Sequence, residues 1–252
     1  DDQSFTLLKD RAPLLLFAGD VGSGKSALAE SFGCDLATHL GTAVELWRLK
    51  LSTRGSGHVG EMTGLISSAF EEVTSEAKLG RHRSTGKVSK VTIMVIDEAD
   101  ALVQSREATQ MHHEDRAGVD AFLAAIDSLA GSGIPMLVVM CTNRIAALDP
   151  AVKRRAAATF NFGRPNEDQR RRVIATALQN YGLTDDTIDK LVIATGPQSP
   201  DHHGFTYSDL TQRLLPTAIL AAYPDNAITA DLLLTVAADL GPTAAFIDQA
   251  SA

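Results

Sequence analysis

A glycine-rich stretch near the start of the chain contains the residue types that bind phosphate. It fits in full the pattern of a glycine, four variable positions and then Gly-Lys-Ser/Thr. Its residues are Gly19, Asp20, Val21, Gly22, Ser23, Gly24, Lys25 and Ser26. Such glycines let backbone N–H groups turn toward phosphate oxygens at the positive end of a helix dipole. The alternative is a strand-to-helix turn with an incidental lysine.

The residues on either side of this stretch favour the phosphate loop. Residues 14–17 form a short apolar run typical of a buried strand, and residues 27–30 are good helix formers. Lys25 would neutralise the β- and γ-phosphates of ATP. Ser26 would give its hydroxyl to Mg²⁺, which keeps most of its water and shares the phosphate oxygens. With the backbone as far as Ala27, this stretch is predicted to bind ATP and Mg²⁺.

Two carboxylates follow a second apolar run and would add hydrolytic chemistry. Residues 91–96 are nearly continuously apolar, as in a central strand of a parallel sheet, and Asp97 and Glu98 stand at its carboxyl end. Asp97 is predicted to complete the Mg²⁺ shell, and Glu98 to polarise the water that attacks the γ-phosphate. A solvated acidic turn is the alternative, which the complete phosphate loop upstream disfavours.

A third apolar run, residues 136–141, ends in Thr142 and Asn143. A polar amide at a strand end beside an ATP site can help to hold the attacking water, and strand capping is the alternative role. His113 and Glu114, preceded by a second histidine, lack the spacing of a zinc site. They are predicted to lie in a surface loop.

The segments around these residues alternate between strand and helix patterns. Alternating polarity predicts a strand over 44–49, and amphipathic spacing predicts helices after Lys25, after Glu61 and around 119–126. Beyond the boundary at residues 163–165 all the patterns are helical. We therefore expect an α/β fold, a phosphate-loop NTPase with a parallel sheet flanked by helices, over residues 1–163. A small all-helical lid domain is expected over 164–252.

Composition limits the classes of function. A chain of 252 residues has room for one large and one small domain. Its net charge of −8 is not typical of a nucleic-acid binder, although a local basic patch stays open. Two cysteines without Cys-x-x-Cys spacing indicate neither a disulfide framework nor a zinc site. Without a membrane-length apolar run or signal peptide, we expect a soluble, cytoplasmic protein.

In their joint order these motifs resemble those of the AAA+ ATPases, over nearly the whole chain. The likeness is carried by the phosphate loop and by residues 96–100, 141–144 and 148–155. The resemblance implies a helical lid on an α/β domain, ATP between them, and a ring-shaped homo-oligomer, commonly a hexamer. By position, Asn143 matches the first sensor. Arg155, or else Arg154, matches the arginine that closes the neighbouring subunit's site.

Two further assignments come from the substrate-remodelling branch of that family. Residues 204–210 resemble its second-sensor region, but no arginine stands at the usual sensor position, and Arg213 is the candidate substitute. His58, Val59 and Gly60 lie where these proteins place a pore loop that grips the substrate, with His58 at the aromatic position. A glycine-rich surface loop without substrate contact is the alternative.

Residues 119–127, 213–216 and 221–223 look most like the pachytene-checkpoint ATPases, which remodel HORMA-domain proteins. In bacteria such relatives accompany HORMA proteins and cyclic-oligonucleotide synthases in antiphage defence. The resemblance implies an ATP-driven remodeller that threads a HORMA-domain substrate through a ring. The composition predicts no membrane partner and does not favour nucleic acid as a partner. Three alternatives stay open: a remodeller of another protein, a DNA-associated AAA+ loader, and a nucleotide-gated scaffold that rarely hydrolyses ATP.

Overall fold

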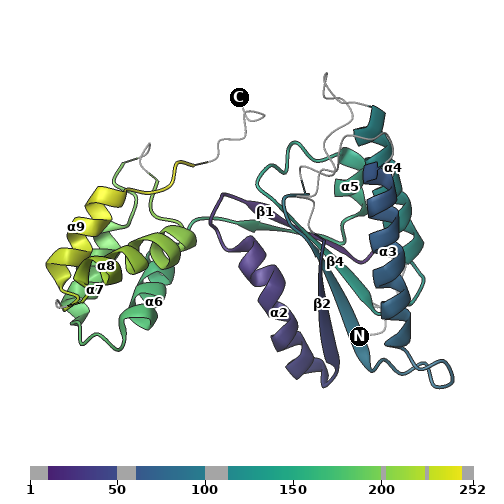
Figure 1. The fold of residues 1–252 in the computed structure, drawn as a ribbon, viewed down its shortest axis with the longest axis horizontal. Helices are drawn as coiled ribbons and strands as arrows, with labels where there is room; N and C mark the ends of the chain where they lie inside the picture. The colour runs from purple at the N-terminus through teal and green to yellow at the C-terminus, as the bar shows by residue number, and fades with distance from the viewer. Residues whose placement is uncertain (1–10, 50–60, 100–112, 200–202, 225–226, 246–252) are drawn as a thin grey trace. The chain divides into compact units, whose positions relative to one another are not determined.

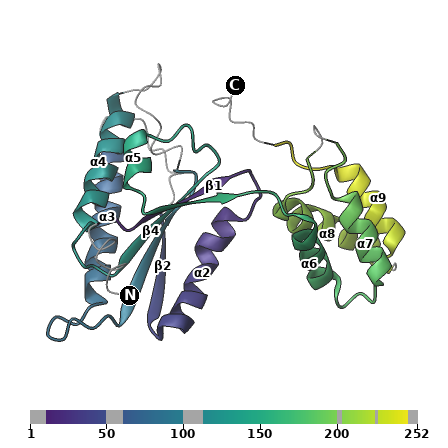
Figure 2. The same cartoon turned by 180° about the vertical axis from the view of Figure 1, so that it is seen from behind.

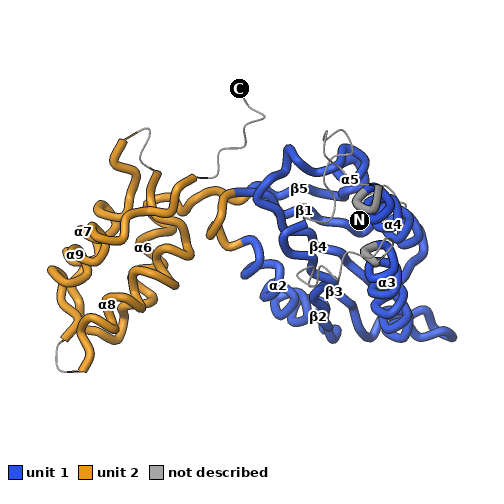
Figure 3. Tube along the Cα trace, turned by 45° about the horizontal axis from the view of Figure 1, so that its top comes forward, with its two compact units in different colours: residues 1–19, 25–161, 250–252 blue, residues 20–24, 162–249 orange. Residues whose placement is uncertain are grey.

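The structure is a computed structural model that describes residues 11–49, 61–99, 113–199, 203–224 and 227–245. These residues divide into two compact units, coloured separately in Figure 3. One unit holds the described residues up to Gly19 and those from Lys25 to Asn161. The other holds Asp20–Gly24 and the described part of Phe162–Gln249. The tip of the glycine-rich loop therefore groups with the C-terminal unit, although both of its flanks belong to the first.

The first unit is built on a five-stranded sheet with the order β2-β3-β4-β1-β5. The strands are β1 (Leu14–Gly19), β2 (Ala43–Leu49), β3 (Lys90–Ile96), β4 (Met136–Thr142) and β5 (Ala158–Phe162). The pairs β2–β3, β3–β4 and β4–β1 are parallel. The helices that connect them are α2 (Lys25–Leu40), α3 (Glu61–Leu79) and α4 (His113–Leu129). This arrangement confirms the predicted fold class.

The sheet is covered on both faces, which explains why its central strands are apolar throughout. Figures 1 and 2 show α2 on one face and α3 with α4 on the other. Met94 and Ile96 of β3 belong to the core that includes Phe70 of α3 and Phe122 of α4, whose rings meet edge to face at 5.7 Å. On the α2 face, Gly33 allows close approach, because a Cβ there would lie 3.2 Å from the Val44 side chain.

The strand register aligns the carboxyl ends of the three central strands. Met140 of β4 is paired with both Leu16 of β1 and Ile96 of β3. The phosphate loop, Asp97 and Asn143 each follow one of these aligned strands. The sheet order thus brings to one edge the three stretches that the sequence singled out, as expected for the ligand edge of a parallel sheet.

Two local predictions differ from the structure. His113 and Glu114, expected in a loop, begin α4. Residues Pro150–Arg155 form a helix, α5, that the sequence analysis did not predict. Asp149 caps α5 by accepting a hydrogen bond from the Ala151 N–H at 2.7 Å, and Pro150 occupies its first turn. Six residues are too few for an apolar period to show, so only these end signals could have revealed the helix.

The second unit is helical and has its own core. Its helices are α6 (Glu167–Leu178), α7 (Asp185–Ala194), the π-helix η2 (Asp209–Leu214), α8 (Leu215–Ala222) and α9 (Ala230–Leu240). Ile174, Leu191, Leu210 and Leu233 are buried together from four of them. Pro216 accounts for the π-helical turn of η2. Proline has no N–H to donate to the carbonyl of residue 212, and in an α-helix its ring would clash with that carbonyl. No helix within the described ranges is long and apolar enough to span a bilayer.

Candidate functional site

The phosphate loop runs from the end of β1 to the first turn of α2. Gly22 and Gly24 have φ angles of +70° and +93°, which residues other than glycine rarely adopt. Lys25 is only 6% exposed, and its Nζ donates a hydrogen bond to the Gly19 carbonyl at 3.0 Å. The lysine is thus folded back over the mouth of its own loop. The loop thus leads directly into the N-terminus of α2, where a helix dipole favours an anion.

The tip of this loop packs on the segment that the sequence assigned to the second sensor. The Ser208 N–H donates to the Gly22 carbonyl at 3.1 Å. A Cβ on Gly22 would lie 2.7 Å from Thr206 Oγ1, so no larger residue fits there. Asp20 accepts a hydrogen bond from Arg164 Nε at 2.8 Å. All these residues belong to the second unit, so the helical part of the chain holds the loop tip.

The two carboxylates lie at the exposed end of β3. Asp97 Oδ1 accepts a hydrogen bond from the Glu98 N–H at 2.9 Å, which forms a tight turn. Glu98 has a φ of +52° and is the one non-glycine residue with positive φ among the described residues. For an ordinary side chain this conformation costs on the order of 1 kcal/mol, and such strain concentrates at active sites. The backbone therefore aims Glu98 in a direction that a relaxed strand end would not.

Cys141, near the end of β4, lies on the strand between the one that leads to the phosphate loop and the one that leads to Asp97. Burial raises the pKa of its thiol to about 12, and the negative charge of Asp97 acts in the same direction. Lys25 and a hydrogen bond with Ser26 act in the opposite direction on the same pKa. Asp97, Lys25 and Ser26 thus all influence the pKa of one buried thiol. These three side chains are therefore all within electrostatic reach of this thiol at the carboxyl end of β4.

The end of β4 also positions the predicted first sensor. The Thr142 hydroxyl accepts a hydrogen bond from the Arg144 N–H at 2.9 Å, which turns the chain sharply after the strand. Asn143, at this turn, is half-buried. The turn therefore follows the strand that lies between β1 and β3, beside the two strands that end in the loop and in Asp97.

The two arginines of α5 differ in their surroundings. Arg154 is exposed. Arg155 donates to both carboxylate oxygens of Asp127 on α4, from Nε at 2.6 Å and from NH2 at 2.7 Å. This pairing lowers the pKa of Asp127 and raises that of Arg155. Asp127 was named by the sequence only as part of a family resemblance, since its partner lies 28 residues away.

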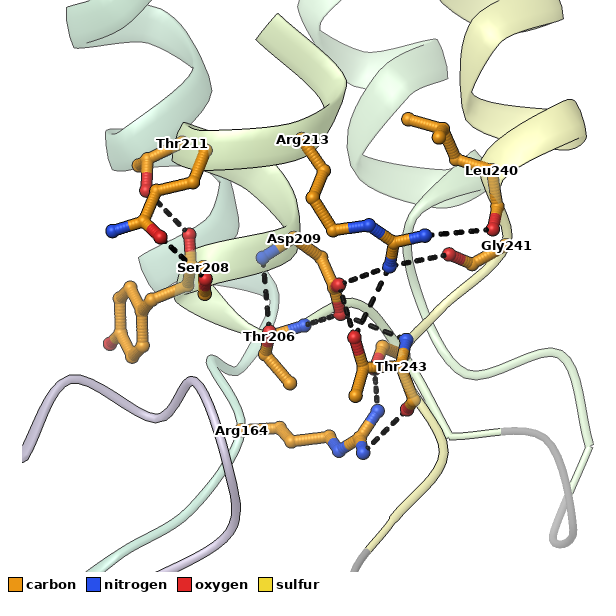
Figure 4. Close-up of polar contacts among 12 residues, drawn as sticks. Arg164, Thr206, Ser208, Asp209, Thr211, Arg213, Leu240, Gly241 and Thr243 are labelled. Carbon is orange, nitrogen blue, oxygen red and sulfur yellow. Dashed lines mark hydrogen bonds and ion pairs between the residues drawn. The ribbon is translucent and has the colours of Figure 1, made fainter. Parts of the chain in front are cut away.

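Arg213 is bound within the helical unit (Figure 4). Its guanidinium donates to Asp209 Oδ1 at 2.6 Å and to the Leu240 carbonyl at the end of α9 at 3.3 Å. Burial raises the pKa of Asp209, but hydrogen bonds from Thr243, Thr206 and Arg213 outweigh it and lower the pKa to about 2. Asp209 is fully buried. Arg213 thus lies on a buried carboxylate rather than on the phosphate loop.

The predicted pore-loop residues His58, Val59 and Gly60 lie outside the described residues. Sequence reasoning also missed two contributors to the site. Arg164 was named only as part of a domain boundary, and Thr243 was not named. A basic residue next to a proline at a domain boundary was the available signal for Arg164. Nothing local marked Thr243, because its partners lie 34 and 79 residues away.

Together, a parallel sheet and a phosphate loop that meets two carboxylates at its carboxyl edge define a phosphate-loop nucleoside triphosphatase. The sequence family described as "ATPase family associated with various cellular activities (AAA)" matches residues 15–164. The chain belongs to this family. The predicted nucleotide-binding ATPase class is thereby confirmed. Among the described residues no group of three or more histidine, cysteine, aspartate or glutamate side chains gathers to hold a metal by itself.

Two relatives from Escherichia coli are similar along most of their length. CD-NTase-associated protein 6 of strain MS 115-1 is 51% identical over 239 residues, which cover 95% of this chain and 76% of the relative. The protein of the same name from strain KTE188 is 36% identical and covers 94% and 76%.

Two solved structures share the fold and the sequence. The first is titled "Structure of E. coli MS115-1 HORMA:CdnC:Trip13 complex". It matches with a TM-score of 0.90 and 47% identity, and covers 98% of this chain and 80% of that one. The structure of Rhizobiales Trip13 matches with a TM-score of 0.72 and 43% identity, and covers 95% and 78%. These matches support the predicted resemblance to HORMA-remodelling ATPases.

Proposed function

We propose that this chain is an ATP-driven remodeller of a HORMA-domain protein in a bacterial cyclic-oligonucleotide antiphage system. The observation that carries the ATP-dependent part is that the phosphate loop and Asp97 follow β1 and β3, whose carboxyl ends are aligned on either side of β4. The remodelling part rests on the similarity to CD-NTase-associated protein 6 and to the ATPase in the HORMA:CdnC:Trip13 complex. The cytoplasm is the compartment in which such a system would act.

The residues of the loop edge have distinct roles in this proposal. Backbone N–H groups from Asp20 to Ala27 hold the phosphates, and Lys25 neutralises them. Glu98 orients the attacking water, and Asn143 holds that water from the neighbouring strand. Transition-state charge is neutralised by Arg155, or else by Arg154, of an adjacent subunit in a homo-oligomeric ring, commonly a hexamer.

The oxygen ligands at this edge suit Mg²⁺. Ser26 contributes a hydroxyl and Asp97 a carboxylate, and both influence the pKa of the Cys141 thiol on the strand between them. Mg²⁺ prefers hard oxygen ligands, needs few from the protein and retains several waters. Ser26 and Asp97 would hold the ion, which when bound would supply positive charge against the negative charge that develops on the phosphate oxygens.

Two substitutions test the ATPase roles. Glu98→Gln keeps the size of the side chain but removes the carboxylate that orients water, so ATP should bind and turnover should be nearly lost. Lys25→Ala removes the charge that holds phosphate, so binding should fall as well. Both are measured by steady-state ATPase assays and by calorimetric binding of ATP with Mg²⁺. Normal turnover by Glu98→Gln would remove Glu98 from the proposal.

A second assay separates the candidate activities. Steady-state ATP hydrolysis is measured alone, with a purified HORMA-domain protein and with duplex DNA. Stimulation by the HORMA-domain protein, together with its conversion to another conformer, is the expected result. Stimulation by DNA alone would favour an AAA+ loader. Tight ATP binding without hydrolysis under any condition would favour a nucleotide-gated scaffold.

The pore loop is the proposed contact with the substrate. An imidazole ring at His58 keeps a flat face for gripping extended polypeptide, although it is smaller than a phenol and can become charged near pH 6.5. His58→Ala with Val59→Ala should leave ATP hydrolysis intact and abolish remodelling, whereas His58→Tyr should retain it. Full remodelling by the double alanine variant would place the substrate contact elsewhere.

A further inference from the structure

Arg164 lies just after β5 and joins three segments of the second unit. Its Nε donates to Asp20 Oδ2 at 2.8 Å, NH1 to the Gly204 carbonyl at 2.6 Å, and NH2 to the Thr243 carbonyl at 2.8 Å. These acceptors are 144, 40 and 79 residues away in the sequence. Because the guanidinium is planar and its donors have fixed directions, one side chain sets the relative positions of all three segments.

The first of these segments is the phosphate loop itself. Asp20 occupies the first variable position of the loop, where a carboxylate repels a polyphosphate. The side chains of Arg164 and Asp20 are only 13% and 16% exposed, so little water screens either charge. The positive charge of Arg164 therefore offsets the negative charge of Asp20 at short range. The other carboxylate oxygen, Asp20 Oδ1, accepts a hydrogen bond from the Val21 N–H of the loop at 2.8 Å.

The third segment, which follows α9, is itself anchored (Figure 4). The Thr243 N–H donates to Asp209 Oδ2 at 3.0 Å, and its hydroxyl donates to Asp209 Oδ1 at 2.6 Å. Asp209 is also bound by Arg213. The carbonyl that Arg164 uses is thus held by a buried carboxylate. Arg213 contacts Asp209 and not the phosphate loop, whereas Arg164 donates a hydrogen bond directly to Asp20 of the loop.

We propose that Arg164 is the positioning residue through which the helical unit prepares the phosphate loop for nucleotide. It neutralises Asp20 and ties the loop tip to the segments at Gly204 and Thr243. This inference rests on the proposed function, since it takes the loop to be the ATP site. It assigns to Arg164 the link between lid and loop that the sequence analysis sought in Arg213.

The test is a double-mutant cycle on the full chain, with affinities for ADP and for ATP with Mg²⁺ measured by calorimetry. Arg164→Ala should weaken binding by about ten- to a hundredfold, because it leaves Asp20 uncompensated beside the phosphates. Asp20→Ala removes the carboxylate that Arg164 offsets, and its affinity is the reference for the double variant. Arg164→Ala with Asp20→Ala should recover to within about twofold of Asp20→Ala, the usual error of additivity.

Arg171→Ala is the matched control, because it removes one positive charge from an exposed pair with Asp189 in the same unit. Its affinity should equal that of the wild type. If the double variant stays as weak as Arg164→Ala, the arginine does not act through Asp20 and the proposal fails. It also fails if Arg164→Ala binds like the wild type.

Circular dichroism during thermal unfolding shows whether each variant is folded. Should Arg164→Ala not fold, Arg164→Lys and its combination with Asp20→Asn provide the same comparison. Lysine keeps the charge but not the three-way fork, so it should weaken binding less than tenfold, and Asp20→Asn should recover that loss. No recovery would overturn the proposal. If the wild type itself binds neither nucleotide, the proposed function fails and this inference with it.

Discussion

Two arginine–carboxylate pairs have similar hydrogen-bond distances but differ greatly in their exposure to solvent. Arg155 and Asp127, in the first unit, are 33% and 51% exposed, with a shortest bond of 2.6 Å. Arg164 and Asp20, in the second unit, are 13% and 16% exposed and are joined at 2.8 Å. Distance alone does not distinguish the two pairs, whereas exposure does.

This difference determines what each arginine can do. Water and salt screen an exposed pair, which contributes at most about 1 kcal/mol and can be exchanged for another anion at little cost. A nearly buried pair is costly to break, because the remaining partner is left uncompensated. Arg155 is therefore suited to leave Asp127 for a phosphate in a neighbouring site, as we propose. Arg164 is suited to stay in place and hold the loop.

The largest expected effect concerns Arg155, the arginine of the more exposed pair. If Arg155 acts in a neighbouring subunit, Arg155→Ala should slow ATP hydrolysis by about 10³- to 10⁵-fold while nucleotide binding is kept, because the arginine is needed only as charge develops. Mixing this variant with inactive Lys25→Ala should restore part of the activity in steady-state assays. If mixed rings form and no activity returns, Arg155 does not act in trans.

A fully buried carboxylate extends the comparison to stability. Asp209 is 0% exposed and receives bonds from Arg213 and Thr243. Asp209→Asn should lower the free energy of unfolding by about 3 kcal/mol, because an amide NH2 group replaces one of two buried oxygens that accept hydrogen bonds from Thr206 and Thr243. The Arg213 side chain is 39% exposed and can be solvated. Urea titration at pH 7 measures it. A loss below about 1 kcal/mol would contradict the idea that a buried carboxylate is more costly to remove than an exposed one.

The same carboxylate predicts a dependence on pH. The pKa of Asp209 falls from 3.8 to about 2 on folding. A lowered folded-state pKa stabilises the protein above the unfolded pKa, so this contribution is complete above about pH 5. It is lost as the pH falls through 4 toward 2, and is worth about 2 kcal/mol. Urea midpoints for the wild type and Asp209→Asn should therefore converge as the pH is lowered, and parallel curves would contradict this.

The smallest expected effect concerns the carboxylate of the exposed pair. Asp127→Asn should change the free energy of unfolding by less than about 1 kcal/mol, since solvent screens the pair and Arg155 also donates to the Ala151 carbonyl. Urea titration beside Asp209→Asn makes the comparison direct. Equal losses for the two variants would remove the distinction between exposed and buried pairs.

The sequence by itself determined the parts of this protein that are local. A phosphate loop is eight consecutive residues between a strand and a helix, and Asp97 and Glu98 adjoin an apolar run, so spacing along the chain was enough to find them. Strands covered on both faces must be apolar throughout, which made β1, β3 and β4 visible. The helix α5 was not predicted, because its six residues form less than two turns and show no apolar period.

Only the tertiary structure decided which charged groups meet. The sequence analysis made Arg213 the candidate for the second sensor and placed Arg164 only within a domain boundary. Packing placed Arg213 on Asp209 at the end of α9, and Arg164 on Asp20, which is 144 residues away. Pairing over such separations depends on how whole elements pack, and a single arginine leaves no period or spacing in the sequence by which its partner could be recognised.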